Sequence, residues 1–95
     1  MKLPNKFTVG IRKYTVLLTN ALPKALRGRI TYDTKLIEVR PQQPRRQAHT
    51  FWHEVTHAIL YDMGDKNYKN ELFVEEFSRR LEQIIQTAKF NDPPK

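Results

Sequence analysis

The segment from Pro44 to Gly64 is the strongest constraint on the fold, because it has no internal proline or glycine and its apolar residues recur at helical spacing. Proline suits the first turn of a helix, and glycine readily adopts the left-handed conformation that ends one. We therefore expect one long helix over residues 44–64. A wheel at about 100° per residue gives this helix a broad apolar face. That face consists of Trp52, Val55, Ile59, Leu60 and Met63, widened by Phe51 and Ala58. A helix that is apolar on most sides is normally buried, so the rest of the chain must cover it.

The residues before this helix favour β-structure. Phe7 to Asn20 is rich in β-branched and aromatic residues and is interrupted by Gly10, which predicts one or two strands. Residues 29–40 contain two apolar segments on either side of an Asp33-Thr34-Lys35 turn, which predicts a hairpin. We therefore expect residues 1–40 to form a small antiparallel sheet.

The residues after Gly64 predict a polar connector and a second helix over residues 70–89. Apolar residues in that range recur every three or four positions and form one stripe. They are Phe73, Val74, Phe77, Leu81, Ile84, Ile85 and Ala88. Residues 90–95 include Pro93 and Pro94, and we expect this tail to fray. The predicted fold class is α+β, with a small antiparallel sheet packed on two long helices in a single domain over residues 1–95.

The first helix carries a pattern with chemical meaning, His53-Glu54-Val55-Thr56-His57. Residues four apart lie one turn up the same helical face, so both imidazoles can reach one metal ion. Glu54 lies about 100° around the helix from His53, where it can act on a water beside the metal. The pattern is the HExxH signature of zinc hydrolases, with Glu54 as the general base.

A third metal ligand is expected, because a catalytic zinc ion usually takes three protein ligands and keeps one position open. The chain has no cysteine, so the third ligand must be His, Asp or Glu. The second helix is the expected source. Glu71 lies in its first turn and is the carboxylate nearest to the apolar stripe, whereas Glu75, one turn further on, is the alternative.

Two further residues flank the motif, each with two interpretations. His49 precedes His53 by four residues and is either a ligand or supporting group of the metal, or an ordinary histidine at the helix end. Tyr61 follows His57 by four residues. Its hydroxyl can stabilise an oxyanion, and the simpler interpretation is a partly buried structural tyrosine.

The net charge of +7 gives the chain a positive surface that attracts nucleic acid, anionic membranes or acidic proteins. Lys and Arg are spread along the whole chain, so charge alone selects no partner. An alternative function is therefore a basic binding module for nucleic acid or protein, with a structural or vestigial metal.

No segment approaches the roughly 20 apolar residues of a membrane span, and residues 1–10 lack an apolar run of signal-peptide length. We expect a cytoplasmic protein with no membrane contact.

Residues 44–90 resemble a known family. Phe-Trp-His-Glu-Val-Thr-His-Ala-Ile-Leu from Phe51, followed by Asn-Glu-Leu-Phe-Val-Glu-Glu-Phe-Ser-Arg-Arg-Leu from Asn70, looks like a minimal zincin. It is similar to small phage and prophage metallopeptidase-like proteins related to the ImmA/IrrE type. In that type the second helix has a glutamate, then a small residue three positions later, then a phenylalanine followed by a small residue. Glu71, Val74 and Phe77-Ser78 take those places here.

This resemblance implies a zincin core of sheet and helices, a zinc ion held by His53, His57 and Glu71, and a protein or peptide substrate. Two departures from the family pattern stand out. Val74 replaces the usual small residue, and the interval between His57 and Glu71 is shorter than in larger relatives. Together, motif and resemblance predict zinc-dependent peptide hydrolysis with Glu54 as the catalytic residue.

Overall fold

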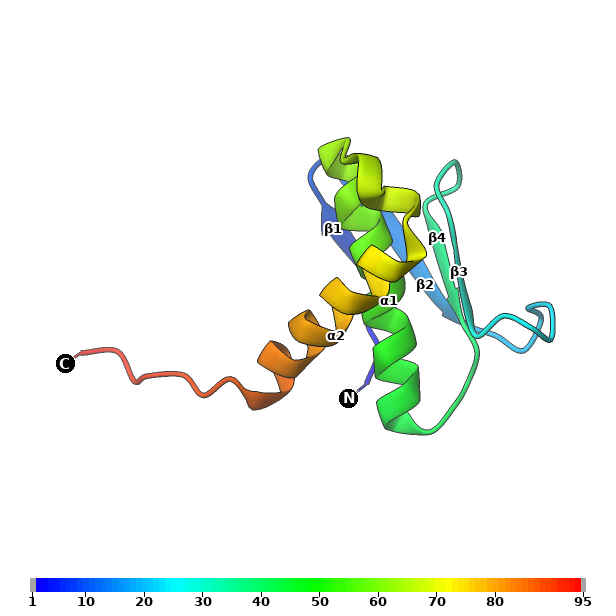
Figure 1. Ribbon diagram of the computed structural model, residues 1–95. Helices are drawn as coiled ribbons and strands as arrows, with labels where there is room; N and C mark the ends of the chain where they lie inside the picture. The colour runs from blue at the N-terminus through cyan, green and yellow to red at the C-terminus, as the bar shows by residue number, and fades with distance from the viewer. Residues whose placement is uncertain (1, 95) are drawn as a thin grey trace.

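The computed structural model describes residues 2–94 and has a four-stranded sheet followed by two long helices. The elements are β1 (Lys6–Val9), β2 (Arg12–Leu18), β3 (Gly28–Thr31), β4 (Leu36–Val39), α1 (Pro44–Met63), the 3-10 helix η1 (Lys66–Lys69) and α2 (Glu71–Thr87). Helix α1 lies across one face of the sheet, and α2 packs against α1 before its C-terminal half extends away from the body (Figure 1). The predicted α+β class is confirmed.

The sheet has the strand order β1-β2-β4-β3, and it is mixed. Strands β1 and β2 form an antiparallel hairpin whose turn contains Gly10 at φ 59°. Strands β3 and β4 form the predicted second hairpin. Strands β2 and β4, however, are parallel, with Thr15 opposite Leu36. The expectation of a purely antiparallel sheet is therefore wrong at this central pair.

The parallel pair follows from the connection between β2 and β3, residues 19–27, which carries the chain past the position of β4. Its Leu22 side chain is buried, at 5% exposure. Arg40, directly after β4, donates hydrogen bonds to the carbonyls of Leu22 at 2.9 Å, Pro23 at 3.0 Å and Leu26 at 3.1 Å. These hydrogen bonds hold the connection against the end of β4, where the chain crosses from β2 to the edge strand β3.

The core is a single layer between the sheet and α1. Alternate residues of the central strands face the helix, as the period of two in a strand requires. The buried cluster is Tyr14, Val16, Ile37, Val39, Phe51, Val55 and Ala58. The opposite face of the sheet carries exposed residues such as Lys13, Thr15 and Leu17. The sheet therefore packs against α1 with one face only, while α2 and η1 pack against α1 as well.

The ends of the helices are set by local residues. Pro44 is in the first turn of α1, and Gly64 closes the helix in the left-handed conformation at φ 69°, as predicted. The predicted polar connector contains the short helix η1. Asn70 caps α2 by accepting a hydrogen bond from the backbone N–H of Phe73 at 3.1 Å. This cap begins α2 at Glu71, directly beside the middle of α1.

Helix α2 is slightly shorter than the predicted 70–89 and uses only part of its apolar stripe. Val74 and Ser78 are fully buried against the body, whereas Phe77 and Ile84 are 46% and 63% exposed. Residues 88–94 form no helix or strand, and the last residue of the expected tail lies outside the described range.

Within residues 2–94, no helix combines the length and apolar character needed to cross a membrane.

Candidate metal centre

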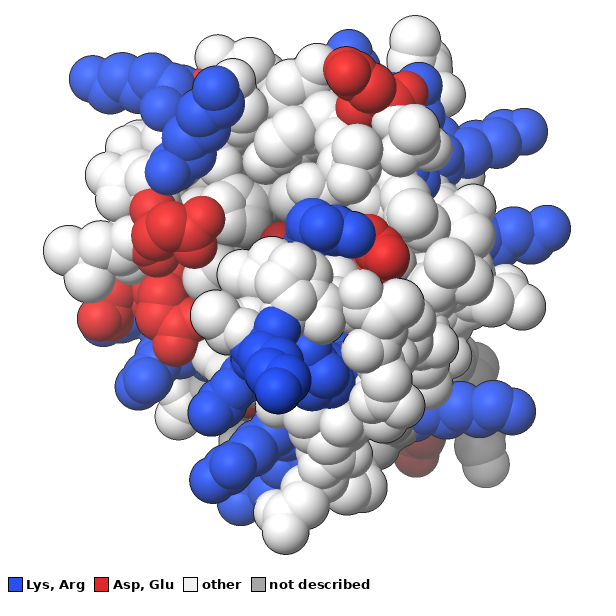
Figure 2. Space-filling view, turned by 90° about the vertical axis from the view of Figure 1, so that its right-hand side faces the viewer, with Lys and Arg blue, Asp and Glu red and all other residues white. Residues whose placement is uncertain are grey.

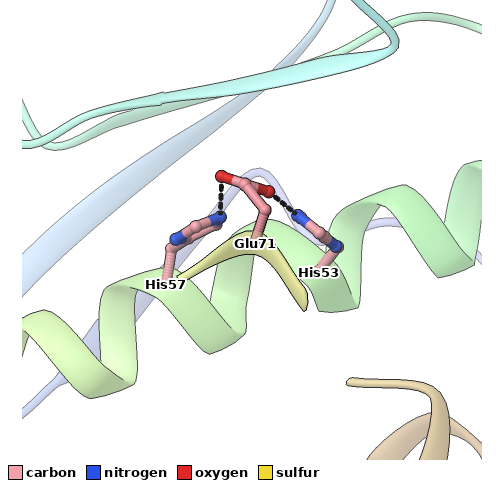
Figure 3. A group of neighbouring side chains, drawn as sticks. All are labelled: His53, His57 and Glu71. Atoms are coloured by element: carbon pink, nitrogen blue, oxygen red, sulfur yellow. Dashed lines mark hydrogen bonds and ion pairs between the residues drawn. The ribbon is translucent and has the colours of Figure 1, made fainter. Parts of the chain in front are cut away.

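Two histidines of α1 and one glutamate of α2 converge on one point (Figure 3). Nε2 of His53 lies 3.0 Å from Oε2 of Glu71, and Nε2 of His57 lies 3.1 Å from Oε1 of the same carboxylate. The three potential ligand atoms are all within 4.8 Å of one another. The structure thus brings together the three residues that the sequence predicts as metal ligands.

The other ring nitrogen of each histidine has its own partner. Nδ1 of His57 lies 2.6 Å from the backbone carbonyl of Tyr68, and Nδ1 of His53 lies 2.9 Å from Oε1 of Glu75. A hydrogen on Nδ1 leaves the lone pair on Nε2, the nitrogen that faces Glu71. Histidines that hold metals typically donate their second N–H to a carbonyl or a carboxylate in this way.

The sequence left Glu71 and Glu75 open as the third ligand, and their positions favour Glu71. Glu71 is on the Nε2 side of both histidines, whereas Glu75 is on the Nδ1 side of His53. Of the two glutamates, only Glu71 has its carboxylate beside the Nε2 atoms of both histidines. Two nitrogens and one carboxylate oxygen also fit the known donor preference of zinc in catalytic sites. The residues present therefore fit the implied ion.

Behind the ligands, Glu75 is the centre of a polar network. Nε2 of His49 is 3.1 Å from both of its oxygens, and Nε of Arg79 is 3.1 Å from Oε2. Partial burial raises the pKa of Glu75, but hydrogen bonds to His53, Arg79 and His49 outweigh burial and lower it to about 2. His49 is accordingly a support of this carboxylate and lies outside the ligand trio.

Glu54 is buried at 7% exposure and faces the space between α1 and β3. Its Oε2 atom would be 3.1 Å from a Cβ atom placed on Gly28, so the missing side chain at Gly28 gives the carboxylate its room. Burial raises the pKa of Glu54 to about 7, the charge of His53 lowers it, and that of Glu71 raises it further. A carboxyl group with this pKa exchanges protons readily near neutral pH.

An open cleft of about 600 Å³ contains the site. Strand β3 forms one wall, α1 forms the other, and the end of η1 borders Glu71. The lining residues that matter most are Arg27, Gly28, Tyr32, Thr50, His53, Glu54, His57, Lys69 and Glu71. The volume is within the range of small-molecule and peptide side-chain sites.

Tyr61 is part of an aromatic cluster. Its ring stacks on Tyr32 at 4.3 Å and meets the edge of Tyr68 at 5.4 Å. This packing supports the structural interpretation of Tyr61. Tyr32, which the sequence did not single out, lines the cleft instead, and burial together with the charge of Glu54 raises its pKa, so its hydroxyl stays protonated.

Three supporting groups were missed from the sequence: Tyr32, Arg79 and the Tyr68 carbonyl. Arg79 follows Glu75 by four residues on α2, a spacing at which opposite charges meet, and this pattern was available in the sequence. The role of a backbone carbonyl cannot be predicted from a pattern of side chains.

Comparison of the chain with protein-family models, curated proteins and solved structures gives no match. A function for the chain must therefore be argued from the geometry of the site.

Proposed function

We propose that the chain is a zinc-dependent peptidase built as a minimal zincin. One observation carries the proposal: Nε2 of His53, Nε2 of His57 and the Glu71 carboxylate meet at one point, beside the buried carboxyl group of Glu54. The Nδ1 contacts to Tyr68 and Glu75 support it, because they orient both rings toward that point. The family resemblance of residues 44–90 agrees with the same assignment.

The residues of the chain have separate roles in this proposal. His53, His57 and Glu71 hold the ion. A bound zinc ion supplies Lewis acidity for the scissile carbonyl and lowers the pKa of water. Glu54 accepts the proton of the attacking water and then passes it to the leaving amine nitrogen. In the metal-free protein, burial raises the pKa of Glu54 to about 7, so the buried carboxylate accepts a proton more readily than an exposed glutamate does.

Strand β3 can bind an extended substrate, because it is an edge strand of the sheet. The backbone N–H of Arg40 donates to the carbonyl of Arg27 at 2.8 Å, so these two residues form a hydrogen-bonded pair of the antiparallel ladder. Along such a ladder, hydrogen-bonded pairs alternate with pairs that exchange no hydrogen bond. The backbone groups of Gly28 and Ile30 consequently face away from β4. An extended peptide that pairs with them lies along the cleft as an added strand.

The test is hydrolysis of a peptide pool by zinc-loaded protein, compared with three variants. Glu54→Gln should keep zinc and lose turnover by at least about a hundredfold, the usual scale for a general base. His53→Ala and His57→Ala should lose zinc. Glu76→Gln is the matched control, since Glu76 pairs with Arg80 on the exposed side of α2. Full activity of Glu54→Gln would remove the assigned base.

A basic binding module is the second candidate. Lys and Arg outnumber Asp and Glu on the face seen from the β3 side of the sheet (Figure 2), and the net charge is +7. In this case the metal is structural or vestigial, and the surface binds nucleic acid or an acidic protein. Binding of a DNA duplex that weakens steeply with salt, with no peptide hydrolysis, would favour this candidate.

A further inference from the structure

Two cations that line the cleft lack an acidic partner. The ion pairs of the described residues 2–94 include neither Arg27 nor Lys69, although both side chains are exposed at the rim. Arg29, the third cation of the cleft, differs. Its Nη2 lies 2.9 Å from Oε1 of Glu38 on the neighbouring strand, which neutralises it. Two unpaired positive charges therefore remain.

Arg27 marks one end of the cleft. Strand β3 runs alongside α1, and the chain at Gly28 is so close to the helix that an added Cβ atom would be 2.5 Å from the Thr50 methyl group. Arg27 directly precedes Gly28. Its positive charge is therefore at the Thr50 end of the cleft.

Lys69 marks the other end. The opposite end of β3 leads into Tyr32, whose ring stacks on Tyr61, eleven residues beyond Thr50 on α1. The ring of Tyr68 is 5.6 Å from Tyr32, and Nζ of Lys69 is 5.4 Å from the centre of the Tyr68 ring. The ammonium group is thus held beside the tyrosine cluster, with the metal-site residues between it and Arg27.

The middle of the cleft has the opposite charge. Glu54 and Glu71 both line it between the two ends. Once a metal ion is bound at His53, His57 and Glu71, the nearby carboxylates are compensated, while the two terminal cations still lack partners. A ligand that spans the cleft would be complementary if it carried a negative charge at each end and a neutral section over the metal site.

We infer that the cleft selects extended acidic peptides, with an Asp or Glu side chain on each side of the bond to be cleaved. This inference rests on the proposed peptidase function. A nucleic acid strand fits less well, because it would place phosphate charges at regular intervals, including opposite Glu54 and Glu71. A peptide can place its uncharged backbone there and pair with Gly28 and Ile30.

The test uses a pair of peptides that differ only in Glu or Gln on both sides of one cleavable bond, with zinc-loaded protein at low ionic strength. An exposed charge pair contributes up to about fivefold, so two pairs should give the Glu peptide roughly a tenfold higher kcat/KM. The double variant Arg27→Gln/Lys69→Gln should remove the preference. Lys6→Gln/Lys13→Gln changes the net charge equally, at exposed positions on the far face of the sheet, and should retain it.

Three outcomes overturn the inference: equal cleavage of both peptides, a preference that survives in Arg27→Gln/Lys69→Gln, or a preference lost equally in the control. If the two peptides are cleaved equally, competitive inhibition by a DNA oligonucleotide would identify nucleic acid as the better ligand of the cleft. Binding of both peptides to zinc-loaded Glu54→Gln, followed by fluorescence anisotropy, separates the two proposals. Preferential Glu-peptide binding without hydrolysis by the unmodified protein contradicts the peptidase and supports the acidic-peptide site.

Discussion

Glu75 lies 2.9 Å from Nδ1 of His53, on the opposite side of the imidazole ring from Glu71. His49 and Arg79 hold the Glu75 carboxylate in turn. The orientation of the His53 ring is therefore set in part by residues outside the candidate ligand trio of His53, His57 and Glu71. This arrangement distinguishes the site from two histidines that merely share a helix face.

Replacing Glu75 by Gln should weaken zinc binding about tenfold to a hundredfold, the usual effect of removing a carboxylate behind a ligand histidine. The amide keeps the size of the side chain but loses the charge that orients His53. Competition with a chromophoric chelator measures the affinity. Glu76→Gln, on the next residue of α2 and paired with Arg80, should bind zinc normally. Equal affinities for the two variants would mean that Glu75 has no positioning role.

A side chain at Gly28 should clash with residues of α1 and fit only if those residues shift. A Cβ atom there would be 2.5 Å from Cγ2 of Thr50 and 3.1 Å from Oε2 of Glu54. Gly28→Ala should therefore lower the free energy of unfolding by about 1 to 3 kcal/mol through overpacking, and disturb Glu54. Urea denaturation measures the first effect, and peptide hydrolysis measures the second.

A second substitution provides the control for this clash. Thr50→Ser removes the methyl group and keeps the hydroxyl that accepts a hydrogen bond from Gln42 at 3.1 Å. Stability lost in Gly28→Ala should return in the double variant Gly28→Ala/Thr50→Ser, and Thr50→Ser alone should be near neutral. If the double variant is as unstable as Gly28→Ala, the contact between β3 and Thr50 is not the cause.

The buried Glu54 carboxyl group should make the metal-free protein less stable as the pH rises. Its pKa is about 7 in the folded protein, compared with the ordinary value of 4.5. Below pH 4.5 both folded and unfolded states are protonated and no penalty exists. Between pH 4.5 and 7 the folded state binds more protons, so the free energy of unfolding falls with pH. Above pH 7 the full penalty remains, roughly 3 kcal/mol.

Glu54→Gln tests this effect, because it removes the titrating carboxyl group, keeps the size of the side chain and leaves every other titratable residue in place. After treatment with EDTA, the variant should be more stable than the unmodified protein at pH 8, and the difference should disappear below pH 4.5. Urea denaturation at both pH values provides the comparison. A stability difference that does not vary with pH would show that Glu54 has an ordinary pKa.

Local rules predicted the parts of this fold that depend on neighbouring residues in sequence. Pro44, Gly64 and the helical spacing of the apolar residues between them predicted α1, because helix ends and helical periodicity are properties of a single segment. The parallel pairing of β2 with β4 could not be predicted this way. It depends on where the connection between β2 and β3 takes the chain, and the contacts of that connection, such as those with Arg40, follow no periodic pattern in the sequence.

In the candidate site, too, residues within one helix could be predicted from the sequence, whereas a contact between two helices could not. His53, Glu54 and His57 followed from the motif, whereas a helical wheel could not choose firmly between Glu71 and Glu75. The wheel gives the direction of each side chain on α2 but not the angle and position at which α2 crosses α1. The cap at Asn70 and the burial of Val74 and Ser78 fix that crossing and bring Glu71 to both Nε2 atoms.

The most direct test of the proposed metal centre is the zinc content of tag-free protein prepared without chelators, measured by elemental analysis. We expect one zinc ion per chain in the unmodified protein and in Glu54→Gln. We expect little or none in His53→Ala, His57→Ala and Glu71→Ala. An unmodified protein that holds no zinc and gains no thermal stability when zinc is added would contradict the metal centre and the function proposed from it.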